Sequence, residues 1–541
     1  MKNYQSILMK WQIYVIGMIA VLLASMVFMT TPVRSEEPDD FSDEDLSKIE
    51  LLGKYVFFDK ISDPERMACV TCHDPETGGT GSVSGVNLHD VAITGANPHT
   101  IGNLKPPTNA YANLIAPFHE CNSGGLGGNN HCGGNFWNGR ADGNETALYP
   151  NGATKHIGNE IFFETDGTPL DGDVADYAAF FGPTSDQALN PMPNPVEQNI
   201  SRQGVCEHVA SAKYAELYEE VWGVSIDCSD EVVTVQAGDL DPTDESDDEK
   251  AFDISFKRLM LAVGAWQGSL DVNSFSSKRD KALKRELDGI DVDDTPGEFP
   301  LVGLTDEENY GHDLFYATRF APMEVTIIND DGEEEVVEKF SNCAFCHSDN
   351  PLTPGPGPKD TGAELFQLYS ADDYHNIGTP PNLEIPGMYD ENGELIDEDQ
   401  DPDMGIAGHV DGLPRGFFKT PTVRNVDKRK GNGFTKAYTH NGWFKSLESL
   451  VHFYNTANVN GATAADYGIT RCPDGVDTEK EALANNCWPA PAYSQPSALP
   501  FLVGDLHLTP EDEAALVAYM KTLTDEHSAK APKPYKPSKK K

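Results

Sequence analysis

The sequence predicts a mainly α-helical protein with two similar domains in tandem, on the basis of three observations. The pentapeptide Cys-x-x-Cys-His occurs twice, at 69–73 and at 343–347. A segment with the apolar spacing of an amphipathic helix precedes each copy, Leu51–Asp59 before the first and Asn309–Tyr316 before the second. Alternating patterns that would indicate strands are few. The repetition therefore indicates one helical unit that occurs twice.

The repeated pentapeptide is the attachment signal for c-type haem. Its two thiols add to the two vinyl groups of one haem, and the adjacent histidine ligates the iron. A zinc site would need both cysteine pairs to converge on one ion and would not need the histidines, so we favour two covalent haems. Their attachment residues are Cys69, Cys72 and His73, and Cys343, Cys346 and His347. The predicted fold is thus two cytochrome c-type haem domains in tandem, with long acidic loop inserts.

Residues 1–35 have the pattern of an export signal or a membrane anchor. Lys2 and Lys10 precede an apolar stretch from Trp11 to about Met29, and a run of acids follows. The stretch is nearly long enough to span a membrane and has no clear cleavage site, so removal and retention in the inner membrane both stay open. Either outcome exports the chain to the periplasm, an oxidising compartment.

Six further cysteines form three pairs that are close in the sequence. In an oxidising compartment each pair is expected to close a surface loop as a disulfide. The pairs are Cys121 with Cys132, Cys206 with Cys228, and Cys472 with Cys487.

The chain is strongly acidic, with 87 acidic and 40 basic side chains among 541 residues and a formal net charge of −47. Dense acidic runs occur at Glu36–Asp45, Asp239–Glu249 and Asp390–Asp403. Nucleic acid is therefore not expected as a partner. Such runs are usually solvated surface, but a field of this strength also favours encounter with a basic redox partner at low salt.

The motif positions set the expected domain boundaries. We expect the first haem domain at 36–300, the second at 301–528, and a disordered basic tail of alternating Lys and Pro at 529–541. Leu508–Glu513 has the pattern of a capped helix start and opens the closing helix of the second domain. A β-hairpin is predicted at Glu324–Val337 around Asp330–Gly332.

Further motifs resemble the bacterial dihaem cytochrome c peroxidases and their relative MauG, which oxidises tryptophans in a partner protein. The resemblance extends from about Leu51 to Thr524. The motifs are Leu52–Asp59, Phe136–Arg140, the Gln-x3-Pro-x5-Glu element of Gln187, Pro191 and Glu197, Phe418–Asn425, and His440–Gly442. This resemblance implies an oxidoreductase that reacts with hydrogen peroxide.

The resemblance to this family implies that peroxide reacts at the first haem and that His73 is the proximal ligand of that haem. Glu197 matches the family's distal acid–base residue, which moves a proton between the two peroxide oxygens. Gln187 and Pro191 belong to the same element. Trp137 matches the residue that passes electrons between the haems.

The resting state of the first haem depends on a second histidine. His89 stands 16 positions after His73, where the peroxidases carry a histidine that caps the iron at rest. His99 lies in the same loop and competes for this role. If neither histidine reaches the iron, the first haem is open at rest.

At the second haem, His347 is implied as the proximal ligand. The peroxidases supply methionine as the other ligand, but the matching position here, 14 residues after His440, is Tyr454, as in MauG. A thioether raises the haem potential, whereas a phenolate lowers it. His452 is the competing ligand on another face of the same predicted helix.

The family also holds calcium between its domains. The resemblance places carbonyl ligands at Thr435 and Ala437, while the family's asparagine ligand aligns near Lys105, with Asn103 close by. Calcium is therefore an open expectation.

Together these observations predict a cytochrome c peroxidase. Peroxide is reduced to water at the first haem, with electrons passed through the second haem from a small redox protein, such as cytochrome c or a cupredoxin. One alternative is MauG-like oxidation of a partner protein's aromatic residues through highly oxidised haems. Others are a dihaem electron carrier and a redox-sensing module. A homodimer is compatible with each reading. No phosphate-binding loop or hydrolase arrangement stands out.

Overall fold

The computed structural model describes residues 41–121, 130–143, 156–233, 250–292, 295–329, 331–348, 365–495 and 502–537. Residues 42–541 form one unit, separate from residues 1–41. The predicted export segment and the acidic run at 239–249 lie outside the described residues. Within the described ranges, no helix has the length and hydrophobicity needed to cross a membrane.

The described chain is mainly helical, as the sequence predicts. Its α-helices are α2 (Lys48–Phe58), α3 (Cys69–Cys72), α4 (Ser84–His89), α5 (Pro183–Ala188), α6 (Arg202–Ser211), α7 (Ala215–Trp222), α8 (Ala251–Gln267), α9 (Lys278–Leu287), α10 (Asp306–Tyr316), α11 (Cys343–Cys346), α12 (Leu447–Thr456), α13 (Ala462–Tyr467), α14 (Glu479–Ala484) and α15 (Pro510–Lys521).

Strands are short and pair two by two. They are β1 (His119–Glu120) with β2 (His131–Cys132), β3 (Met323–Ile328) with β4 (Glu334–Lys339), β5 (Tyr374–His375) with β6 (Phe418–Lys419), and β7 (Thr470–Arg471) with β8 (Cys487–Trp488). The first three pairs are antiparallel and the last is parallel. The pairing of β3 with β4 confirms the predicted hairpin.

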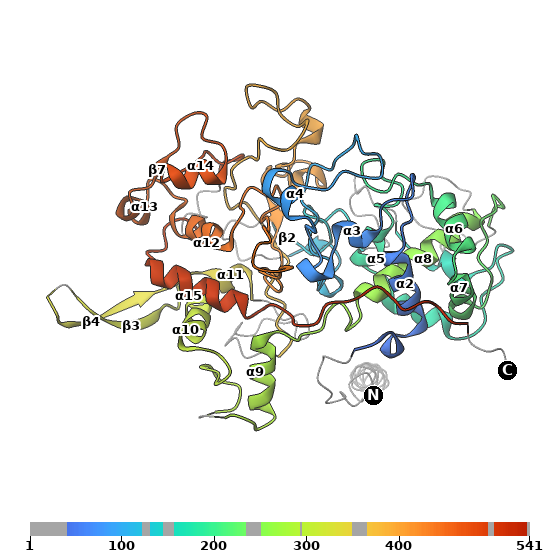
Figure 1. The fold of residues 1–541 in the computed structure, drawn as a ribbon, viewed down its shortest axis with the longest axis horizontal. Helices are drawn as coiled ribbons and strands as arrows, with labels where there is room; N and C mark the ends of the chain where they lie inside the picture. The colour runs from blue at the N-terminus through green and yellow to red at the C-terminus, as the bar shows by residue number, and fades with distance from the viewer. Residues whose placement is uncertain are drawn as a thin grey trace, which may run out of the picture. The chain divides into compact units, whose positions relative to one another are not determined.

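Apolar side chains gather in two large cores. The first core takes residues from α2 and α5 to α8, and the second from α9, α10, α12 and α15. Figure 1 shows the first set of helices on the right of the view and the second on the left. The change between cores falls between Trp266 and Ala282. Helix α9 therefore packs in the second core, although the predicted boundary at residue 300 assigns it to the first domain.

The same close helix crossing occurs once in each core. A Cβ atom added to Gly53 of α2 would lie 1.8 Å from the carbonyl oxygen of Ala262 in α8. One added to Gly311 of α10 would lie 2.0 Å from the carbonyl oxygen of Ala515 in α15. Only glycine allows two backbones to approach this closely. The repeat seen in the sequence thus corresponds to a packing arrangement that occurs twice.

Local signals in the sequence agree with the structure. All three predicted disulfides are present. Helix α15 begins as predicted, with Pro510 in its first turn and the Thr509 side chain accepting the N–H of Asp512. The cysteines of each pair are close in sequence, and the cap of α15 involves neighbouring residues. Neither the disulfides nor this cap therefore depends on the rest of the fold.

The predicted disordered tail is wrong for residues 529–537. Ala529 is buried in the first core, and Tyr535 packs against that core and donates a hydrogen bond from its hydroxyl to Glu220 over 2.9 Å. The N–H of Lys533 donates to Asp43 over 2.8 Å, and its carbonyl accepts from Tyr55. The composition of this segment indicates a solvated tail, but the Ala529 and Tyr535 side chains pack with apolar residues of the first core. Residues 538–541 lie outside the described chain.

Candidate active site

The first cysteine pair and His73 lie on the wall of one cavity. Helix α3 begins where the Thr71 hydroxyl accepts the N–H of Ala68 over 2.9 Å. The Nδ1 of His73 lies 3.0 Å from the carbonyl oxygen of Gly79, and burial lowers the pKa of this histidine. Because a carbonyl only accepts, Nδ1 carries the proton. The imidazole is therefore neutral, with an Nε2 lone pair suited to iron.

The second motif repeats this arrangement in another cavity. The Nδ1 of His347 lies 3.2 Å from the carbonyl oxygen of Tyr369. Burial again lowers the histidine pKa. The Tyr369 ring is fully buried, and its hydroxyl lies 2.8 Å from that of Tyr519 on α15. The acceptor for His347 is therefore fixed by the second core.

Both cavities fit a c-type haem. Among the described residues, the cysteines of the two motifs are the free thiols. Burial raises the pKa of Cys69 and Cys343 to about 11 and that of Cys72 to about 12, so these thiols carry no charge into the cavities. The first cavity encloses about 1330 Å³ and the second about 1530 Å³, counting solvent at their mouths.

The predicted Gln-x3-Pro-x5-Glu element lies on the first cavity. Gln187, Pro191 and Glu197 all line it, together with Arg140. The Oε1 of Glu197 accepts a hydrogen bond from the side-chain amide of Asn194 over 2.6 Å. Burial raises the pKa of Glu197, against the opposing effects of Asn194 and Arg140. The structure thus brings Gln187 and Pro191 to the same cavity as Glu197, whose carboxyl group binds a proton more readily than usual.

Two close backbone contacts fix this element. A Cβ added to Gly95 would lie 2.3 Å from the carbonyl oxygen of Val196, and the N–H of Ala96 donates to the Glu197 carbonyl over 2.6 Å. On the other side, Gly264 of α8 lets Ser185 of α5 approach so closely that a Cβ would lie 2.0 Å from its hydroxyl. Helix α5 carries Gln187, so the first core positions that amide.

The structure does not place His89 as a cap on the first cavity. His89 ends α4 and is exposed, and His99 is exposed as well. Within the described ranges, neither histidine lines the cavity. The buried residue of α4 is Asn87, whose side-chain amide donates to the carbonyls of Gly81 and Thr435, each over 2.9 Å. Asn87 therefore takes the inward position on this short helix.

Trp137 lines both cavities. Its indole N–H donates to the carbonyl of Lys105 over 2.7 Å, and the N–H of Lys105 donates to the carbonyl of His440 over 2.8 Å. The His440 ring stacks on Phe418 with centroids 3.5 Å apart, and its Nε2 lies 2.6 Å from Asp403. These contacts form a continuous array between the cavities. Asp403 stands 37 residues before His440, and nothing in the sequence predicts this pairing.

Tyr454 of α12 lines the second cavity with the second motif. Burial raises the pKa of its hydroxyl, and the two motif thiols add to this effect. The competing His452 is absent from the described lining, and its Nδ1 lies 3.0 Å from Glu513. Met520 of α15 also lines this cavity and packs in the second core. The geometry favours Tyr454 over His452 as the residue of α12 that faces the site.

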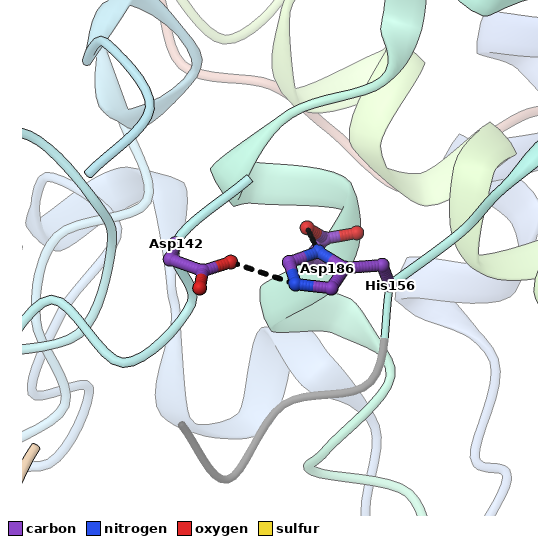
Figure 2. Close-up of side chains that lie close together, drawn as sticks. All are labelled: Asp142, His156 and Asp186. Carbon is purple, nitrogen blue, oxygen red and sulfur yellow. Dashed lines mark hydrogen bonds and ion pairs between the residues drawn. The ribbon is translucent and has the colours of Figure 1, made fainter. Parts of the chain in front are cut away.

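A buried triad that the sequence did not predict includes Asp186, the residue before Gln187 of the first cavity. Figure 2 shows His156 between Asp142 and Asp186. Its Nε2 lies 2.9 Å from Asp142 and its Nδ1 lies 2.7 Å from Asp186. Burial disfavours a positive charge on His156 and so lowers its pKa. The hydrogen bonds to the two aspartates outweigh this effect and raise the pKa of His156 to about 10. Both ring nitrogens are engaged, so the triad acts as an ion cluster, although its donor atoms lie within 4.8 Å of one another.

Two cavities that each combine paired thiols with a neutral imidazole match the attachment sites of a dihaem c-type protein. Residues 47–288 match the sequence model of the di-haem cytochrome c peroxidases. The chain is 24% identical over 477 residues to the methylamine utilization protein MauG of Paracoccus denitrificans, and the match covers 88% of each chain. The chain is therefore similar to the dihaem cytochrome c peroxidase and MauG family, whose members are oxidoreductases with two c-type haems.

Solved structures show the same fold. The diheme peroxidase BthA of Burkholderia thailandensis superposes with a TM-score of 0.50 at 20% identity, over 91% of this chain and 90% of that one. A single-residue variant of BthA gives the same TM-score of 0.50 at 18% identity, over 90% of each chain.

Proposed function

We propose that the protein is a periplasmic peroxidase that reduces hydrogen peroxide to two molecules of water at the first cavity, using two electrons and two protons. The observation that carries this proposal is the first cavity itself. It combines the Cys69–His73 motif with Gln187, Pro191 and Glu197, and His73 is the only histidine on its described lining. A haem bound there supplies an iron that binds peroxide and exchanges electrons with it.

The chain's own contribution to this reaction is proton transfer. Glu197 accepts the proton of the inner peroxide oxygen and returns it to the outer oxygen, which then leaves as water. Its raised pKa helps the first transfer, because a carboxylate that binds protons more readily is better able to accept the proton and to hold it until the second transfer. The positive charge of Arg140 stabilises the carboxylate form between turnovers. Trp137 provides the route along which electrons arrive singly from the second cavity.

Stopped-flow mixing of peroxide with the fully oxidised, never-reduced holoprotein tests this proposal. Because His73 is the one histidine on the described lining of the first cavity, we expect one equivalent of peroxide to change the haem absorption at once and to be consumed. A spectrum that stays unchanged until one electron is supplied would contradict an open site. In that case His89 or His99 must reach the iron in solution.

A second function, MauG-like oxidation of a partner protein, is favoured by Tyr454. A phenolate stabilises oxidised iron, so a tyrosine-ligated second haem would store an oxidising equivalent instead of delivering an electron. The partner would then be the electron source, replacing a small redox protein. The acidic run Asp390–Asp403 ends at the array between the cavities, since Asp403 contacts His440. For either function we therefore expect a partner protein with a basic surface.

Changing Tyr454 to methionine is expected to raise the reduction potential of the second haem and to abolish any phenolate charge-transfer band. Potentiometric titration with absorption spectroscopy measures both effects. Tyr467→Phe is the matched control, since the Tyr467 hydroxyl donates to the Leu508 carbonyl over 2.8 Å and is absent from the described lining of the second cavity. An identical potential and spectrum in Tyr454→Met and wild type would rule out tyrosine ligation.

A further inference from the structure

The residues implied for a family calcium site do not fit a divalent cation. Calcium takes roughly six to eight oxygen ligands, usually with carboxylates among them. The Thr435 carbonyl already accepts the amide of Asn87 over 2.9 Å. The Asn103 amide donates to the carbonyl of Gln400 over 2.8 Å. Lys105, at the aligned asparagine position, brings an amine into the buried interior.

A second amine, that of Lys436, lies in the same region. Its side chain is only 4% exposed, and its Nζ lies 2.9 Å from the carbonyl oxygen of Thr77, 2.8 Å from that of Asn425 and 3.2 Å from that of Lys428. An ammonium group has three protons to donate, so these three carbonyls satisfy it fully. Burial and the neighbouring Lys105 lower the pKa of Lys436, while the three carbonyl dipoles favour its protonated form.

The contacts of Lys436 join two distant parts of the chain. Asn425 and Lys428 lie next in the chain to two valines of the second core. Val423 packs within that core and Val426 packs against it. Thr77 belongs to the loop after the first motif. Gly78 makes room for this contact, because a Cβ there would lie 3.3 Å from the Lys436 Nζ and its φ is +76°.

The neighbouring Lys105 holds the same loop from another side. Its Nζ donates to the Thr80 hydroxyl over 2.6 Å. Between Thr77 and Thr80 lies Gly79, whose carbonyl accepts the Nδ1 proton of His73. Two lysines thus restrain both ends of the loop that orients this imidazole.

Only a carboxylate that is itself engaged by other groups acts on Lys436 within the described part of the chain. Among the described residues, neither Lys105 nor Lys436 forms an ion pair. The carboxylate that faces Lys436 is Asp427, which accepts hydrogen bonds from Arg429 over 2.6 Å and from the Tyr438 hydroxyl over 3.2 Å. A site with two amines and no available carboxylate repels a divalent cation.

We propose that the Lys436 side chain takes the bridging role that calcium has in the family, so that this protein needs no calcium and Lys436 positions the 77–80 loop behind His73. Lys436 is a positioning residue, because it acts on His73 only through the Gly79 carbonyl. The spectroscopic test relies on the haem assignment of the proposed function. The calcium content and the melting temperature in the calcium test do not, so failures of the two can be told apart.

The calcium test uses the purified holoprotein after dialysis against EGTA. We expect elemental analysis to find no stoichiometric calcium, and we expect the melting temperature and the ferric EPR spectrum to stay unchanged when CaCl2 is added. One calcium ion per chain whose removal shifts either property, with recovery on adding calcium, would overturn the proposal.

The positioning test compares Lys436→Met with Lys445→Met. Lys445 is a matched control from the same segment, with one hydrogen bond to the nearby Gly442 carbonyl. We expect Lys436→Met to lower the melting temperature by roughly 4–10 °C, since buried carbonyls lose their donor. It should also shift the EPR signal of the first haem and leave that of the second unchanged.

A milder variant keeps this test decisive if Lys436→Met does not fold. Lys436→Gln retains an amide that donates to some of the three carbonyls, and we expect a smaller shift of the same first-haem signal. A first-haem signal identical to wild type in a folded Lys436 variant would overturn the positioning role.

Discussion

Replacing Glu197 with glutamine is expected to slow the reaction of peroxide with the oxidised protein by about 100- to 10,000-fold, the usual range for loss of a general acid–base residue. Glutamine keeps the shape of the side chain and a hydrogen bond with Asn194 but cannot accept the peroxide proton. Stopped-flow absorption at several peroxide concentrations gives the second-order rate constant. Glu164→Gln, at an exposed glutamate of the same half, serves as the control.

The pH dependence separates proton transfer from a merely structural effect. Only the carboxylate form of Glu197 can take the first proton, so the rate of the wild type should fall as the pH drops through the Glu197 pKa. Burial raises that pKa above the ordinary 4.5, so the fall begins at a higher pH than for an exposed glutamate. The glutamine variant should lack this acidic limb. A variant that reacts as fast as wild type would remove Glu197 from the mechanism.

Replacing His156 with alanine is expected to destabilise the protein by about 3–5 kcal/mol, the cost typical of breaking a buried ion cluster from one side. The change leaves Asp142 and Asp186 buried without their shared cation. Asp186 directly precedes Gln187, and Asp142 lies two residues after Arg140, so peroxide reactivity should fall as well. Chemical denaturation measures the loss of stability. His208→Ala, which breaks a less buried pair with Asp59, is the comparison and should cost less.

The contribution of His156 should depend on pH in a defined direction. Its folded-state pKa of about 10 lies above the ordinary 6.5, so its stabilisation is complete below about pH 6.5 and is lost as the pH rises toward 10. The difference in stability between wild type and His156→Ala should therefore shrink between neutral and alkaline pH. A difference that stays constant up to pH 10 would show that His156 is not held as a cation.

The sequence by itself predicted what depends on neighbours along the chain. The two haem motifs, the helix in front of each, the capped start of α15, the β3–β4 hairpin and the three disulfides all involve residues that are close in sequence. The Gln-x3-Pro-x5-Glu element was implied by the family resemblance, and the structure brings its members to one cavity. Spacing within a short segment fixes these features before any long-range contact forms.

Only the tertiary structure decided which charged and polar groups meet in the interior. The sequence gives no reason for His156 to lie between two aspartates, for Asp403 to contact His440, or for Lys436 to reach Thr77. It also could not show that Asn87, and not His89, faces inward on α4, or that residues 529–537 return to the first core. A buried charge is stable only where partners from distant segments replace water, and those partners are fixed by how the cores pack against each other.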